Sequence, residues 1–318
     1  MRYIVTGGAG FIGSHVAEGL AGKHEVVVLD NLFSGKLENI AHLLDRITFV
    51  RGSVTDLPLL KKVFTGADGV FHEAAIASVP LSVRDPLATN EVNVSGTLNV
   101  AIAARDCGVK KVVFASSSAV YGNDPTLPKR EDMMPDPVSP YAVSKLTGEY
   151  YLRNFSDLYD LKTVSLRYFN VFGPRQDPDS EYAAVIPKFI ARLQKKQAPI
   201  IYGDGGQTRD FIFVRDVVDA NIRAMERSAQ GVYNIASGRG TSVNTLAGIL
   251  ISLSGIPGSP VYEKAREGDI YHSYADISRA RDAFEYTAAS SLEEGLKETA
   301  EWFENQQGDL YIIHYGGR

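Results

Sequence analysis

Short apolar segments alternate with longer amphipathic segments over the first half of the chain. The short segments are almost wholly apolar, which is typical of parallel strands buried on both faces. In the segments between them, apolar residues recur at the spacing of a helix. The pattern therefore predicts a doubly wound α/β fold. The predicted strands are 3–5, 25–29, 47–50, 69–72, 111–115 and 162–167, and the predicted helices are 14–21, 57–64, 86–106 and 141–159.

The alternation becomes less regular after residue 170. A glycine-rich turn at 202–211 leads into a short apolar segment at 212–214, and no clean linker separates this part from the first. The sequence therefore predicts a smaller second region that packs on the first. One predicted helix of this region begins at residue 184, and three others span 214–227, 242–254 and 292–303.

The first predicted strand runs directly into Thr-Gly-Gly-Ala-Gly-Phe-Ile-Gly at residues 6–13. Strand, glycine-rich turn and helix in this order are the context of a dinucleotide-binding fingerprint. Gly7, Gly10 and Gly13 would allow a tight turn, close approach of the backbone to a diphosphate, and close packing of helix on strand. The second strand ends in Asp30, whose carboxylate can accept hydrogen bonds from ribose hydroxyls and repels a 2′-phosphate. The sequence therefore favours NAD over NADP.

Composition excludes several classes of protein. The 318 residues carry a net charge of −5 without long runs of like charge, which argues against a nucleic-acid-binding surface. Cys107 is the one cysteine, and the six histidines form no ligand pair, so we expect no disulfide within the chain and no metal site. No apolar run is long enough for a membrane span, and the chain enters a strand at once, so we expect no signal peptide. A cytoplasmic location is the simplest expectation.

Tyr141 and Lys145 stand four residues apart on a predicted helix, so both lie on one helix face. A protonated lysine can lower a phenol's pKa from its usual value of about 10 and make it a proton acceptor. Ser116, Ser117 and Ser118 follow a predicted core strand and bring hydroxyls to the same edge. Taken alone, the pair is more often an exposed Tyr and Lys, and the serines more often cap a strand. Beside a dinucleotide site they favour hydride transfer, and no Gly-x-Ser-x-Gly turn indicates a Ser-His-Asp triad.

Six segments form an ordered set that extends these motifs. They are the glycine turn at 6–13, Asp-Asn-Leu at 30–32, His-Glu-Ala-Ala at 72–75, Ser-Ser-Ser-Ala-Val-Tyr-Gly at 116–122, Tyr-x-x-x-Lys at 141–145 and Arg-Tyr-Phe-Asn at 167–170. Together they resemble the extended short-chain dehydrogenase/reductase family, and within it the UDP-sugar 4-epimerase branch, from Arg2 to about Phe303. The resemblance implies a Rossmann-type, doubly wound parallel sheet at 1–170 that binds NAD. It also implies a smaller α/β region at 171–318 that mainly binds the UDP-sugar and partly returns to the sheet.

The resemblance assigns the chemistry to three side chains. Tyr141 as phenolate would remove the proton of the sugar's 4-hydroxyl, directly or through Ser117, while a hydride passes from carbon 4 to NAD. The keto sugar would then turn within the pocket and receive the hydride on its other face. Lys145 would hold the nicotinamide ribose and, with the nicotinamide charge, keep the phenol's pKa low. Ser118 is the next candidate for the catalytic hydroxyl.

The resemblance also implies ligand contacts along the chain. Arg209 and Arg266 would bind the substrate diphosphate and Asp269 a ribose. Tyr202 would lie near the uracil, and Asn170 would contact the diphosphate or the sugar. The expected cofactor contacts are Gly7, Gly10, Phe11, Ile12, Gly13, Asp30, Asn31, Ser34, Gly35, Ser53, Val54, Ala74, Ala75, Ala77, Asn93, Tyr141, Lys145 and the backbone of Phe169. Further expected substrate contacts are Ser78, Ser117, Ser118, Tyr141, Ala184, Val185 and Ser273.

Three residues depart from the family pattern. Ser53 stands where an Asp usually bonds the adenine amino group, so NAD is expected to dissociate more readily. Ala77 stands where some epimerases have a Lys that touches the cofactor phosphates. Ser273 replaces the bulky Tyr of epimerases restricted to unmodified hexoses, which leaves room for an N-acetyl group. We therefore expect UDP-GlcNAc and UDP-GalNAc to be accepted alongside, or in preference to, UDP-glucose and UDP-galactose.

Other functions on this scaffold remain open. Dehydratases of the family have an Asp-Glu pair after the hydroxyl residue, whereas Ser118 and Ala119 follow Ser117 here, which counts against dehydration. A UDP-glucuronate epimerase or decarboxylase remains an alternative, and so does a non-catalytic NAD-sensing or scaffold protein. We expect a homodimer, as is usual in the family, and no nucleic-acid or membrane partner. Residues 308–318 extend beyond the family pattern and would pack on the body or on another subunit.

Overall fold

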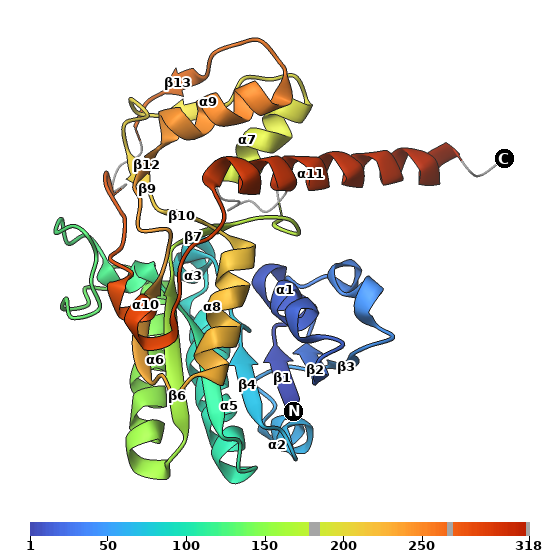
Figure 1. Ribbon diagram of the computed structural model, residues 1–318, viewed down its shortest axis with the longest axis vertical. Helices are drawn as coiled ribbons and strands as arrows, with labels where there is room; N and C mark the ends of the chain where they lie inside the picture. The colour runs from blue at the N-terminus through green and yellow to red at the C-terminus, as the bar shows by residue number, and fades with distance from the viewer. Residues whose placement is uncertain (178–184, 266–269, 316–318) are drawn as a thin grey trace.

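A sheet of seven parallel strands forms the centre of the molecule (Figure 1). The computed structural model describes residues 1–177, 185–265 and 270–315, with side chains to residue 306. The strand order is β11-β6-β5-β4-β1-β2-β3, so the order of the first half reverses between β1 and β4. The strands are β1 (Arg2–Thr6), β2 (Glu25–Asp30), β3 (Thr48–Arg51), β4 (Gly69–His72), β5 (Lys111–Ser117), β6 (Lys162–Tyr168) and β11 (Gly231–Ile235).

Helices cover both faces of this sheet, which confirms the doubly wound fold. Successive residues of a strand point to opposite faces, and Val5 of β1 accordingly packs in one core while Ile4 packs in the other. Because both faces are covered, nearly every strand position is buried, and this explains the wholly apolar runs. One face carries α1 (Phe11–Leu20) and α8 (Val214–Glu226), and the other carries α2 (Leu57–Phe64), α5 (Gly96–Asp106) and α6 (Pro140–Tyr159).

The predicted helix at 86–106 has a more complex structure than its sequence pattern indicates. It consists of α4 (Pro86–Asn90), a π-helical segment at Glu91–Ser95, and α5, and α3 (Val79–Arg84) precedes it. The π segment widens the helix and turns the Asn93 side chain inward, where it is buried. Apolar spacing alone does not distinguish a π segment from a regular helix, so the prediction missed it.

The smaller region lies beyond the carboxyl ends of the large sheet (Figure 1). In the part of it that the structure describes, three two-stranded sheets and three helices surround a core that contains Phe172, Phe189 and Leu246. Its strand pairs are β7 (Asn170–Phe172) with β10 (Phe211–Phe213), β9 (Thr208–Arg209) with β12 (Thr241–Ser242), and β8 (Ile200–Tyr202) with β13 (Val261–Glu263). Its helices are α7 (Val185–Gln194), α9 (Val243–Ser254) and α11 (Leu292–Tyr315), and α10 (Ser278–Phe284) packs beside β11.

Helix α11 is longer than the predicted 292–303. It continues to Tyr315, and its carboxyl end extends beyond the rest of the molecule in Figure 1. The residues after Phe303 lack apolar periodicity, which is why the sequence predicted an earlier end. None of the described helices has both the length and the apolar sequence that crossing a bilayer requires.

Candidate active site

A cavity of about 560 Å³ opens at the carboxyl ends of the strands, beside the reversal of strand order between β1 and β4. Ligands of doubly wound sheets bind at such a position. Most of the expected cofactor contacts line it. They are Gly7, Gly10, Phe11, Ile12, Gly13, Asp30, Asn31, Ser34, Ser53, Val54, Ala74, Ala75, Ala77, Tyr141 and Lys145.

The glycine turn between β1 and α1 leaves no room for larger residues. Gly7 has φ +68°, and a Cβ there would lie 2.6 Å from the backbone nitrogen of Ala74. A Cβ on Gly13 would lie 2.2 Å from the carbonyl oxygen of Gly7. Gly10 caps α1 without a side-chain hydrogen bond, so the N–H groups of the first turn face the cavity. This open helix N-terminus fits the diphosphate of a dinucleotide.

The carboxylate of Asp30 lies at the carboxyl end of β2, where it lines the cavity. Its Oδ2 accepts a hydrogen bond from the Ala9 backbone N–H at 3.0 Å, and Oδ1 accepts one from the Leu32 N–H at 2.8 Å. Two backbone donors on its two oxygens fix the orientation of this carboxylate. It therefore suits the ribose hydroxyls of NAD and disfavours the 2′-phosphate of NADP.

Two further expected cofactor residues lie nearby with different roles. The hydroxyl of Ser53 lines the cavity but also lies 2.8 Å from Thr55 Oγ1, so it has one partner already. Asn93 lies behind the wall. Its Oδ1 accepts from the Ile76 N–H at 2.8 Å, and its Nδ2 donates to Ile76 O and to Ser144 Oγ. Asn93 thus fixes the loop after β4 and does not line the cavity.

Tyr141 and Lys145 lie on α6, which begins in a well-capped turn. Ser139 caps the helix by accepting from the Ala142 N–H at 3.2 Å, and the Tyr141 N–H donates to Ser82 Oγ at 3.0 Å. Lys145 Nζ lies 5.9 Å from the centre of the Tyr141 ring and donates to the Ala115 carbonyl at 2.8 Å. Both side chains line the same cavity as the glycine turn.

Burial dominates the electrostatics of this pair. Burial raises the pKa of Tyr141 above its usual value, and a hydrogen bond with Ser117 offsets this only in part. Burial also lowers the pKa of Lys145, to about 8, against the charge of Glu73. The ammonium bonds a carbonyl instead of the phenol. Lys145 by itself is therefore not sufficient to lower the phenol's pKa.

Glu73 and Tyr168 are site residues that the sequence reasoning missed. Both line the cavity, and the Tyr168 hydroxyl donates to Glu73 Oε1 at 3.0 Å while accepting from Asn221 Nδ2 at 2.7 Å. Burial raises the pKa of Glu73 to about 7. Its place at the carboxyl end of a buried strand was the available signal, because ionisable residues there face the ligand crevice.

A second cavity, of about 260 Å³, lies in the smaller region. It contains four of the expected substrate contacts, namely Asn170, Val185, Tyr202 and Arg209. Arg209 Nη1 donates to the Thr208 carbonyl at 2.9 Å. An amide, an aromatic ring and a guanidinium around an otherwise apolar space suit a nucleoside diphosphate.

Besides Asn93, six expected contacts lie outside the lining of both cavities. Ser117 and Ser118 lie at the end of β5, and Ser78 caps α3. A Cβ on Gly35 would lie 2.9 Å from both Asp30 oxygens, so this glycine allows the chain to pass behind the carboxylate. Phe169 is buried, and its N–H donates to Ile235 O. The sixth is Ser273, whose N–H donates to the Thr208 carbonyl at 3.1 Å. Ala184, Arg266 and Asp269 fall outside the described residues.

Comparison with known proteins places this geometry in a family. The model of the NAD dependent epimerase/dehydratase family matches residues 3–236. The UDP-glucose 4-epimerase of Mycolicibacterium smegmatis is 42% identical over 96% of this chain and 99% of its own. The UDP-N-acetylglucosamine 4-epimerase of Methanobrevibacter ruminantium, solved with UDP-N-acetylmuramic acid, is 44% identical, with a TM-score of 0.93 over 96% of this chain and 98% of that one.

A second solved structure is similar over the same length. The UDP-glucose 4-epimerase of Thermotoga maritima, solved with UDP-glucose, is 41% identical, with a TM-score of 0.92 over 96% of this chain and 100% of that one. Identity at this level over nearly whole chains, together with the family match, decides the assignment. The chain belongs to the NAD-dependent epimerase/dehydratase family.

Proposed function

We propose that this protein is a UDP-sugar 4-epimerase, an isomerase that uses bound NAD to invert carbon 4 of a UDP-hexose. One observation carries the proposal: Tyr141 and Lys145 line the same cavity as the glycine turn and Asp30. A proton acceptor and a dinucleotide site in one cavity are what oxidation of a carbinol requires. The 4-epimerases at 41 to 44% identity support the same reaction.

The chain's own residues would bind the sugar and move its proton. NAD, when bound, would accept the hydride of carbon 4 and later return it, so the cycle has no net redox change. Tyr141 would accept the 4-hydroxyl proton, and Ser117, which shares a hydrogen bond with the phenol, would orient that hydroxyl. Lys145 would donate to the nicotinamide ribose from its buried position on α6.

The second cavity would hold the nucleotide. Tyr202 would lie against the uracil, and Arg209 and Asn170 would bind the diphosphate. We propose that Ser273 leaves room for an N-acetyl group, so that UDP-GlcNAc and UDP-GalNAc are substrates alongside, or in preference to, UDP-glucose and UDP-galactose. The solved relative that is named a UDP-N-acetylglucosamine 4-epimerase supports this choice.

The wider organisation follows from the same proposal. Residues 1–170 would form the NAD-binding part and residues 171–318 the mainly substrate-binding part. From the latter, β11 joins the edge of the large sheet and α8 packs on one face of it. We propose a cytoplasmic homodimer. The single cysteine is consistent with a reducing compartment.

The test is to incubate the purified protein separately with UDP-glucose, UDP-GlcNAc and UDP-glucuronate, without added NAD, and to resolve the products. We expect the 4-epimer of the hexoses, with unchanged mass and redox state. Loss of water or of carbon dioxide would instead indicate a dehydratase or a decarboxylase. Tyr141→Phe should abolish turnover while NAD stays bound, because it removes the proton acceptor and leaves the cavity walls intact. Negligible turnover of the N-acetyl pair beside the plain pair would refute the role of Ser273.

A further inference from the structure

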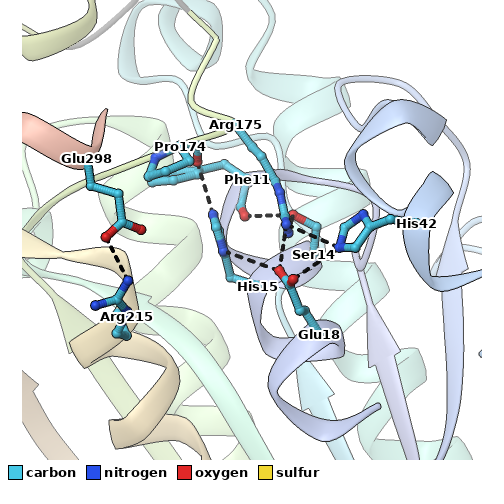
Figure 2. A network of polar contacts seen from close by, with 9 residues as sticks. All are labelled: Phe11, Ser14, His15, Glu18, His42, Pro174, Arg175, Arg215 and Glu298. Atoms are coloured by element: carbon cyan, nitrogen blue, oxygen red, sulfur yellow. Dashed lines mark hydrogen bonds and ion pairs between the residues drawn. The ribbon is translucent and has the colours of Figure 1, made fainter. Parts of the chain in front are cut away.

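Arg175 lies on the loop at residues 173–177, which follows β7 and crosses toward α1 (Figure 2). Its backbone has φ +66°, a left-handed conformation that is unfavourable for a residue with a side chain. Such a conformation persists only where surrounding contacts hold it. The contacts of the guanidinium therefore hold the loop in this conformation.

Two residues on successive turns of α1 hold the guanidinium. Arg175 Nη2 donates to Glu18 Oε2 at 2.5 Å, and Nη1 donates to Ser14 Oγ at 3.3 Å. The Arg175 side chain is only 13% exposed. On its other oxygen, Glu18 accepts from His42 Nε2 at 3.1 Å, so the carboxylate is itself fixed (Figure 2). The guanidinium is thus held in one orientation along α1.

His15 ties down the preceding residue of the loop. Its Nε2 lies 3.0 Å from the Pro174 carbonyl, which can only accept, so Nε2 carries the proton. Burial, together with the charge of Arg175, lowers the pKa of His15 to about 4. The ring is therefore neutral near pH 7, and its 3.9 Å contact with Glu18 is not an ion pair. His15 anchors the loop without competing for Glu18.

Arg175 also lines the large cavity, together with Gly10 to Gly13 at the N-terminus of α1. Glu18 does not line it, so the carboxylate holds the guanidinium from the side away from the cavity. A guanidinium has five N–H donors. The Nε–H and the remaining Nη1–H of Arg175 have no acceptor among the described residues. The cavity is thus bordered by an arginine with available donors.

The charges around the cavity are unevenly placed. Four carboxylates line it, at Asp30, Glu73, Asp85 and Asp177, against three cations, Lys36, Lys145 and Arg175. Lys145 bonds the Ala115 carbonyl deep in the site. Lys36 pairs with Asp177 at 3.5 Å and is 55% exposed. Arg175 is the buried cation of this lining that lies against α1, where the helix N-terminus already favours an anion.

We infer that Arg175 is a cofactor-binding residue, whose guanidinium binds the dinucleotide diphosphate beside the N-terminus of α1. Glu18, Ser14 and His15 position it. The diphosphate is therefore bound from two directions, by backbone N–H groups of the turn after β1 and by a side chain from the loop after β7. The inference rests on the NAD site of the proposed function and is independent of which sugar is the substrate.

The test measures the affinity of NAD by equilibrium dialysis of the holoenzyme, without sugar. Arg175→Gln should weaken NAD binding about tenfold to a hundredfold, as expected for a lost charged hydrogen bond. The binding of ADP-ribose, which has the diphosphate but no nicotinamide, should weaken by the same factor. The matched control is Arg215→Gln, because Arg215 donates to Glu298 at 2.6 Å in a pair outside the cavity (Figure 2). The control should change the affinity less than about twofold.

A merely structural role predicts a different result. A lost phosphate contact makes the affinity of the variant less dependent on salt than that of the wild type, whereas a loosened loop leaves the salt dependence unchanged. Arg175→Met, which is neutral, unbranched and without N–H donors, should repeat the result and replaces the Gln variant if that variant does not fold. NAD affinity within about twofold of wild type, an equal loss in the Arg215 control, or an unchanged salt dependence would each overturn the inference. Sugar turnover plays no part, so a wrong epimerase assignment would leave this result intact.

Discussion

Tyr141 and Lys145 share a helix face, but their polar groups have different partners in the folded chain. The spacing of the two residues and the serines that precede them predicted a site beside a dinucleotide only in combination with the glycine turn at residues 6–13. The direction in which the phenol's pKa shifts was not predictable from the sequence, because the shift depends on how deeply the ring is buried and on which group the ammonium bonds. Glu73 was missed for the same reason, since its charge matters only through tertiary proximity to Lys145.

At this scale we predict that Glu73→Gln narrows the pH range of activity on the alkaline side. Glu73 raises the pKa of Lys145 against the effect of burial, so without its charge the lysine loses its proton at lower pH. Turnover at pH 9 should fall about threefold to tenfold, with a smaller change at pH 7. The amide can still accept from Tyr168, so packing is retained.

The measurement is the pH dependence of kcat/KM for the variant and for Glu298→Gln, whose exposed carboxylate pairs with Arg215. The control should follow the wild-type profile. If the alkaline limb of the kcat/KM profile did not move in Glu73→Gln, the carboxylate would have no influence on the pKa of Lys145.

Among the elements, the turn between β1 and α1 was the most predictable from sequence. Strand, glycines and helix follow each other in the order that the fingerprint requires, and the structure adds the reason, which is steric contact of backbone with backbone. The π-helical segment at Glu91–Ser95 was not predictable, because it preserves the apolar spacing and changes only where Asn93 points. Asn93 consequently supports the loop after β4, at Ile76, from behind the cavity.

We predict that Gly13→Ala destabilises the protein and impairs NAD binding. The added methyl would lie 2.2 Å from the Gly7 carbonyl oxygen, so the turn must shift. A cost of about 1–3 kcal/mol in the free energy of unfolding is typical of such overpacking. Urea unfolding and equilibrium dialysis with NAD would measure the two effects.

The control for this variant is Gly248→Ala, in the exposed face of α9, where a Cβ meets nothing within 4 Å. It should stabilise the protein by about 0.5–1 kcal/mol, because alanine favours the helix. If both alanines behaved alike, steric contact at Gly13 would not explain its role.

In the molecule as a whole, the second region is interwoven with the first. The chain leaves the large sheet after β6, builds part of the smaller region, returns to the sheet as β11, and then completes the smaller region from β12 onward. Alternation of apolar segments predicted the large sheet up to β6. It did not predict β8 and β9, because segments of two or three residues have too little periodicity.

Two buried histidines make the stability of the whole protein sensitive to acid. Burial lowers the pKa of His15 to about 4 and that of His72 to about 3. In the folded state both rings stay neutral down to about pH 4, whereas in the unfolded chain they take up a proton as the pH falls below about 6.5. The free energy of unfolding therefore has its full value above about pH 6.5 and declines as the pH falls toward 4. For His15 the loss is about 2–3 kcal/mol.

Urea unfolding of wild type and His15→Gln between pH 7 and pH 4 would measure this loss. Glutamine can still donate to the Pro174 carbonyl but does not titrate, so the variant should lose less stability over this range. Parallel curves for the two proteins would contradict the assignment to His15.

The connection between β6 and β7 is one residue long and joins the linings of the two cavities. Tyr168 lines the large cavity and Asn170 lines the second cavity. Only Phe169 lies between them, buried and bonded to β11. Two extended residues span at most about 7 Å. The covalent backbone therefore keeps these two lining residues close together. A nucleotide held at its end can present one sugar ring to Tyr141, so the enzyme would select substrates by length as well as by chemistry, and a diphosphate carrying a disaccharide would place the wrong ring beside the reacting groups.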